Sequence, residues 1–191
     1  MSLLPVSEAL QKLESDGLVE SRPRVGTRVC SPSPTDIRER YEVREALESQ
    51  AARLFAERAS VRDRVELRKM AENMDAMFNQ CVPGSTDPDF LYAVHSFHLQ
   101  LHLRIAECTG CRALSSAVQR NQVLIFNWLY DVASRRPPLP PRFHRDLIEA
   151  ICGGDPEAAD RAMRLHIRHG VDFVARAIRP GAKSGVIEPI R

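Results

Sequence analysis

From residue 35 to residue 178 the chain repeats apolar side chains at the three- and four-residue spacing of α-helices. This pattern limits the fold more than any other feature, because no strand signal occurs in the same stretch. It predicts helices at about 35–58, 61–80, 87–108, 111–133, 141–152 and 156–178. Helices with one apolar stripe each must bury those stripes against one another, so we expect a mainly α fold with an antiparallel bundle of about six helices.

The stripes also predict which side chains turn inward. In the first long helix the stripe comprises Ile37, Tyr41, Leu47, Ala51, Leu54 and Phe55. In the second it is predicted to comprise Val61, Val65, Met70, Met74 and Met77. In the third it comprises Phe90, Leu91, Val94, Phe97, Leu101 and Ile105.

Residues 1–33 follow a different pattern, and the run Ser-Pro-Ser-Pro at 31–34 separates them from the bundle. Pro5 suits the start of a short helix and Gly17 its end, and two strand-like runs then flank a glycine-containing turn. One helix and one hairpin cannot bury a core, so we expect a missing upstream segment or a partner to complete this part. The predicted domains are therefore 1–33, 34–178 and a flexible tail at 179–191.

The bulk composition excludes a membrane protein but favours no particular partner. Hydrophobic residues make up 43% and charged residues 27% of the chain, and the net charge is +2. No apolar run approaches the roughly 18 residues that a membrane span needs, and the start does not resemble a signal peptide. The five scattered cysteines favour reduced thiols in a cytoplasmic protein over a disulfide framework.

All six histidines follow residue 94, and four of them fall on apolar helical faces: His98, His102, His144 and His166. His98 and His102 are four residues apart, the spacing at which one helix binds one metal ion through two imidazoles. A single inward histidine is more often a core residue hydrogen-bonded to a carbonyl group. Four in one small bundle are costly to bury unless they share a ligand, so these four are the candidate metal ligands.

The other two histidines and the residues between the pair bear on the chemistry. His95 and His169 are predicted at the edges of their stripes. Zinc peptidases carry a glutamate directly after the first histidine of such a pair, whereas this chain has Leu99 there, which argues against hydrolysis.

Arg44 lies on the inward stripe of the first long helix, where an arginine needs a partner. One possibility is an ion pair within the helix with Glu48, four residues later. The other is a clamp on the carboxylate of a small ligand, because guanidinium binds carboxylate in a bidentate manner. Tyr41, Asn127 and Trp128 are candidates to line the same cavity, although periodicity alone does not separate lining from packing.

The chain resembles the GntR-type transcription regulators of the FadR class, which carry an FCD effector domain. Pro5 to Val19 resembles the recognition helix and the lead into the wing of a winged helix, and Arg22 to Val29 resembles the wing. Tyr41 to Glu48 resembles the start of the FCD domain. His102 before Gly110, His144 before Arg145, and His166 after Met163-Arg164-Leu165 match the family's three metal-binding histidines in order and spacing.

The resemblance implies a metal ion and a small organic acid in the bundle, with Arg44 as the carboxylate clamp. Family members usually carry aspartate where this chain has His98. If His98 takes that place, four neutral nitrogens favour Zn²⁺, Ni²⁺, Co²⁺ or Cu²⁺ over a hard ion, and the undiminished charge of the metal favours an anionic ligand. The alternative is that His98 leaves the metal to the other three histidines.

At the DNA end the resemblance is incomplete. The family has two helices before the recognition helix, and it usually places arginines where this chain has Leu3 and Ser7. Ser7, Arg22, Arg24 and Arg28 remain the candidate DNA contacts, although a solvated hairpin face is the alternative for the arginines. We expect these residues alone to bind DNA weakly.

Together these features predict a regulator that binds operator DNA as a homodimer and responds to a metabolite, with no catalytic residues. Two alternatives stay open: a helical metalloenzyme acting on a small organic acid, and a stand-alone sensor or dimerisation module without DNA binding.

Overall fold

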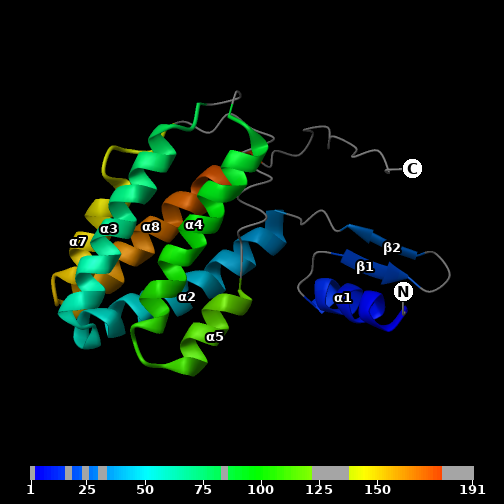
Figure 1. Ribbon diagram of the computed structural model, residues 1–191, viewed down its shortest axis with the longest axis horizontal. Coiled ribbons are helices and arrows are strands. Elements are labelled where there is room, and N and C mark those ends of the chain that lie inside the picture. The colour runs from blue at the N-terminus through cyan, green and yellow to red at the C-terminus, as the bar shows by residue number, and fades with distance from the viewer. Residues whose placement is uncertain are drawn as a thin grey trace. The chain divides into compact units, whose positions relative to one another are not determined.

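The computed structural model describes residues 3–15, 19–22, 26–29, 34–82, 86–121 and 138–177. The chain forms two compact units, residues 1–37 and residues 38–191 (Figure 1). No helix in the described ranges is both long and apolar enough to cross a membrane.

The described part of the first unit contains one helix and one hairpin before α2, as predicted. Helix α1 (Leu3–Ser15) precedes strands β1 (Val19–Arg22) and β2 (Gly26–Val29), which pair antiparallel with Val19 opposite Val29. Glu14 of α1 accepts a hydrogen bond of 2.8 Å from the backbone N–H of Ser21, which ties the helix to the hairpin. Gly26 has a φ of 110°, a conformation that favours glycine and explains its place after the turn.

The second unit is the predicted helical bundle. Its described helices are α2 (Pro34–Arg58), which begins in the first unit, α3 (Val61–Asn79), α4 (Pro88–Glu107), α5 (Arg112–Arg120), α7 (Phe143–Cys152) and α8 (Pro156–Ala177). The helix starts follow from local sequence. Ser60 and Asp63 form a capping box at α3, and Asp87 caps α4, which has Pro88 in its first turn.

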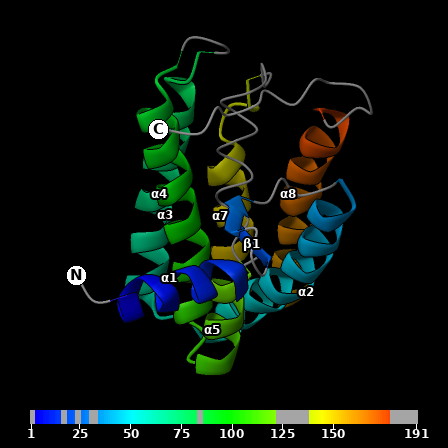
Figure 2. The same ribbon diagram turned by 90° about the vertical axis from the view of Figure 1, so that its right-hand side faces the viewer.

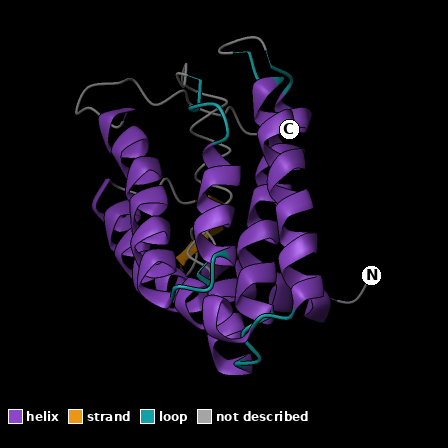
Figure 3. Ribbon diagram, turned by 90° about the vertical axis from the view of Figure 1, so that its left-hand side faces the viewer, coloured by secondary structure: helices purple, strands orange, loops and turns teal. Residues whose placement is uncertain are grey.

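Five of the described helices surround the interior of the bundle. Helix α8 packs on α7, α7 on α3 and α3 on α4, while α5 packs outside against α4 (Figures 2 and 3). Helix α2 completes the circle because Tyr41 approaches Gly170 of α8 and Glu48 contacts His102 of α4. The largest fully buried apolar side chains fill this space: Phe55, Leu67, Met74, Leu101, Ile105, Ile148, Ile151, Met163 and Ile167.

The stripe predicted for the second helix and the end predicted for the fourth differ from the structure. In α3 the buried stripe runs through Leu67, Ala71 and Met74, whereas Val61 and Val65 are 80% and 46% exposed. These valines begin the helix on its solvent side, so a count of apolar residues misplaced the stripe. The predicted helix at 111–133 is α5, which ends at Arg120 where Asn121 leaves helical geometry (φ −88°, ψ 49°), and residues 122–133 lie outside the described ranges.

Candidate metal and effector site

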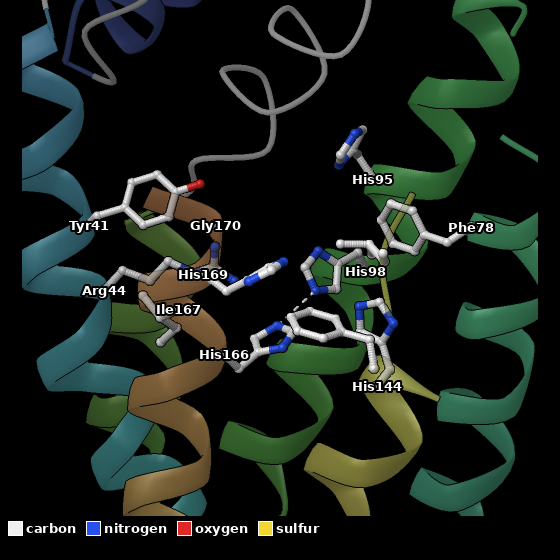
Figure 4. Close-up of a pocket in the computed structure, with 12 residues that line it drawn as sticks. Tyr41, Arg44, Phe78, His95, His98, His144, His166, Ile167, His169 and Gly170 are labelled. Atoms are coloured by element: carbon white, nitrogen blue, oxygen red, sulfur yellow. Dashed lines mark hydrogen bonds between the residues drawn. The ribbon is translucent and has the colours of Figure 1, made fainter. Parts of the chain in front are cut away.

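Four histidine side chains converge in the interior of the bundle, and Figure 4 shows three of them, His98, His144 and His166. His98 and His102 extend from α4, His144 from α7 and His166 from α8. Nε2 of His98 lies 3.0 Å from Nε2 of His102 and 3.3 Å from Nε2 of His166. One nitrogen from each of His98, His144 and His166 lies within 4.8 Å of the others.

Two carboxylates lie next to the outer ring nitrogens of His102 and His144. Oε2 of Glu48 on α2 lies 2.6 Å from Nδ1 of His102. Oδ1 of Asp75 on α3 lies 2.9 Å from Nδ1 of His144, and both carboxylates are buried. A nitrogen that faces an ionised carboxylate carries the proton, so Nε2 of His102 and Nε2 of His144 each present a lone pair instead.

Hydrogen bonding among the histidines does not account for their approach. Since Nε2 of His102 is an acceptor, His98 could donate its Nε2 proton to it. The same nitrogen would then have no lone pair for His166, which lies 3.3 Å away. At most one of these two contacts is therefore a linear hydrogen bond in neutral imidazoles.

The donor set fits a transition-metal ion. Nitrogen ligands at about 2.0–2.1 Å from one metal are separated by about 3.0 Å in octahedral and about 3.4 Å in tetrahedral geometry. The separations of 3.0 and 3.3 Å around His98 fall in this range. Carboxylates that accept from the outer nitrogens of metal-bound histidines are a common feature of such sites, because they fix the tautomer and the ring orientation.

The electrostatics of the site keep two of the candidate metal ligands, His98 and His166, uncharged. Burial, together with neighbouring histidines, holds the pKa of His98 and of His166 well below the ordinary value of 6.5, so both rings are neutral at pH 7. Burial would raise the pKa of Glu48, but Arg44 and His102 outweigh it and lower the pKa to about 2. Hydrogen bonds from His144 and Arg145 outweigh the burial of Asp75 in the same way and lower its pKa to about 2.

Arg44 lies beside the histidines in the same pocket, with Tyr41 on one side (Figure 4). Its Nε donates a 2.8 Å hydrogen bond to Oε1 of Glu48, so the ion pair within the helix is present. Its guanidinium carbon lies 5.6 Å from the ring centroid of Tyr41. Gly170 faces the same ring, where an added Cβ would lie 3.4 Å from Cε1 of Tyr41. Asn127, the third predicted effector contact, lies outside the described residues.

Several pocket residues were missed from the sequence. His95 was predicted at the edge of its stripe but is 2% exposed, because α3 covers that side of α4 and Phe78 meets its ring edge-on. Phe78 stacks on His144 with ring centroids 5.1 Å apart, and Phe143 stacks on His166 at 4.8 Å. The signal for Asp75 was present: it is an acidic residue within the apolar face of α3, where a carboxylate needs partners.

The candidate DNA contacts belong to the first unit. Ser7 is exposed on α1, and Arg28 is exposed on β2, where its Nε lies 2.9 Å from Oε1 of Glu20. The backbone of Arg22 ends β1, while its side chain and the whole of Arg24 lie outside the described parts of the chain.

Comparison with known proteins places this site in a family context. Residues 39–169 match the model of the FCD domain. The chain is 32% identical over 171 residues to the probable D-xylose utilization operon transcriptional repressor of Paenarthrobacter nicotinovorans, covering 87% of this chain and 70% of that protein. It is 28% identical over 172 residues to the HTH-type transcriptional repressor RspR of Escherichia coli K12, covering 88% and 71%.

Solved structures support the same fold. Escherichia coli McbR/YncC superposes with a TM-score of 0.73 at 19% identity, over 94% of this chain and 82% of that one. The putative transcriptional regulator GntR from Rhodococcus sp. RHA1 superposes with a TM-score of 0.71 at 20% identity, over 94% and 83%.

Proposed function

Because the chain belongs to the FCD-domain family of GntR-type transcription regulators, we propose that its helical unit senses a small carboxylate through a bound divalent metal ion. Because its relatives are named as transcriptional repressors, the chain is a transcription regulator and not an enzyme.

The metal ion would be held by His98, His102, His144 and His166. Four neutral nitrogens favour zinc, with nickel, cobalt or copper as the other candidates. The observation that carries this proposal is the pair of buried carboxylates behind His102 and His144. Each carboxylate fixes the proton on the outer ring nitrogen, which turns the inner lone pair toward the same interior point.

The carboxylate effector would lie between the metal ion and Arg44. The ion supplies a positive charge that attracts an anion, and the guanidinium supplies oriented donors. Tyr41 and Gly170 border this space, and the close approach of the two restricts it to a small ligand. Asn127 remains a proposed effector contact from the sequence.

The first unit would contact operator DNA through Ser7, Arg22, Arg24 and Arg28, as part of a winged helix-turn-helix in a homodimer. The support is the helix and hairpin of this unit together with relatives named HTH-type transcriptional regulators. Effector binding would then change operator affinity by favouring one of two arrangements of the dimer.

Elemental analysis of tag-free protein tests the metal proposal. We expect about one transition-metal ion per chain in the wild type and its loss in His102→Ala and His144→Ala. His169→Ala is the matched control, because His169 lines the same pocket but is not one of the four proposed ligands. Wild-type protein without stoichiometric metal, also after dialysis against zinc, would refute the proposal.

A further inference from the structure

The side chain of Glu48 contacts two functionally different groups with its two oxygens. Oε1 accepts from Nε of Arg44 at 2.8 Å, and Oε2 lies 2.6 Å from Nδ1 of His102. All three side chains are buried, with 7%, 5% and 2% exposure for Arg44, Glu48 and His102. We infer that Glu48 is a shared positioning residue, which orients the metal ligand His102 and the anion-binding Arg44 at once.

This inference rests on the proposed function, because it concerns the same pocket. A carboxylate is needed here, since both neighbours are donors and both oxygens must accept. A glutamine at the same place would have one oxygen and one NH₂ group. Whichever way the amide turned, its NH₂ group would face an N–H donor of either Arg44 or His102.

Substitution of Glu48 and substitution of Arg44 should affect metal binding in opposite directions. Glu48 makes Nε2 of His102 a better ligand, because it holds the proton on Nδ1 and increases the basicity of the ring. Arg44 places a positive charge near the metal position, so its removal does not weaken metal binding electrostatically. General damage to the pocket would instead weaken metal binding in either variant.

Zinc affinity, measured by chelator competition on the whole chain, tests this difference in sign. We expect Glu48→Gln to weaken zinc binding about 10–100-fold, and Arg44→Met to leave it unchanged or stronger. Glu45→Gln is the matched control on α2, because Glu45 pairs with Arg164 and Arg168 of α8 rather than with Arg44 or a histidine. Its zinc affinity should stay within about threefold of the wild type.

Unfolding of the metal-free variants separates positioning from folding. If Glu48→Gln does not fold, Glu48→Asp replaces it, because the shorter side chain keeps the charge but cannot reach both partners. Equal zinc affinity of the wild type and the Glu48 variant would overturn the inference, as would an equal loss in Arg44→Met. A wild type that takes up no zinc would instead refute the proposed function.

Discussion

The N-terminus of α7 is capped by a residue from another helix, and this arrangement yields a quantitative prediction. The N-cap position of α7 is Arg142, which has a φ of 63° and makes no capping hydrogen bond with its side chain. Asp75 of α3 takes over that role: Oδ1 accepts from the backbone N–H of His144 at 2.9 Å, and Oδ2 from that of Arg145 at 3.2 Å. The same carboxylate also binds Nδ1 of His144 and Nε of Arg145.

Asp75→Asn should therefore destabilise the metal-free protein by about 3 kcal/mol. An asparagine has one oxygen, so its NH₂ group must face the two donors of either His144 or Arg145. The lost cap costs about 1 kcal/mol, and the lost charge-assisted hydrogen bonds at a buried site cost about 2 kcal/mol more. For a unit of this size that corresponds to a fall in Tm of about 6–12 °C.

Urea unfolding followed by circular dichroism measures this loss without any contribution from metal. Glu72→Gln is the control, because Glu72 is exposed and lies one turn earlier on the same helix. Its effect should stay within about 0.5 kcal/mol. Amide hydrogen exchange should also become faster at His144 and Arg145 in Asp75→Asn alone. If Asp75→Asn unfolds at the same urea concentration as the control, Asp75 does not cap α7 and the reasoning fails.

Three further predictions concern the pocket and the first unit. Zinc at about one hundred times its Kd should stabilise the wild type by about 2.7 kcal/mol and raise Tm by about 5–11 °C. Differential scanning calorimetry with and without a chelator measures this shift, and an unchanged Tm would contradict the prediction. Gly170→Ala should raise the unfolding free energy of the metal-free protein by about 0.5–1 kcal/mol, because alanine favours the helix more than glycine does. The new Cβ would lie 3.4 Å from Cε1 of Tyr41. A lower urea midpoint would mean that the ring cannot accept this contact. Arg28→Ala should weaken binding to operator fragments equally across sequences and reduce the salt slope by about one, and a slope unchanged in fluorescence anisotropy would remove Arg28 from the contacts.

The sequence predicted the faces within each helix better than the contacts between helices. A period of 3.6 residues is sufficient to place Arg44, His144 and His166 inward, and all three are buried. The partner of Asp75 is 69 residues away in the chain. That contact depends on how α3 and α7 are rotated against each other, which periodicity within a helix does not contain. For the same reason the sequence predicted the ion pair of Glu48 with Arg44 within one helix, but not the contact of Glu48 with His102 of another helix.

Local chemistry explains the remaining differences. The start of α7 moved from the predicted residue 141 to Phe143, because Pro141 and Arg142 form a turn in which Arg142 adopts a left-handed conformation. Such a start has no side-chain cap of its own, and so could not be recognised by the usual rule of a Ser, Thr, Asp or Asn before the helix. The stripe of α3 was misplaced because Val61 and Val65 lie in its first turns. There the apolar residues are consistent with more than one face of the helix.

The five described helices around the interior contribute different groups to the site, and this arrangement indicates how ligand binding would affect the whole bundle. Helices α4, α7 and α8 supply the imidazoles, while α2 and α3 supply the carboxylates that orient two of them. A metal ion held by the imidazoles would therefore connect all five helices through contacts of one or two side chains. An anion bound at Arg44 would act on α2 at the Arg44–Glu48 pair, whose glutamate also contacts His102. Because α2 begins in the first unit and continues into the bundle, a shift of this helix would transmit effector binding from the bundle to the first unit.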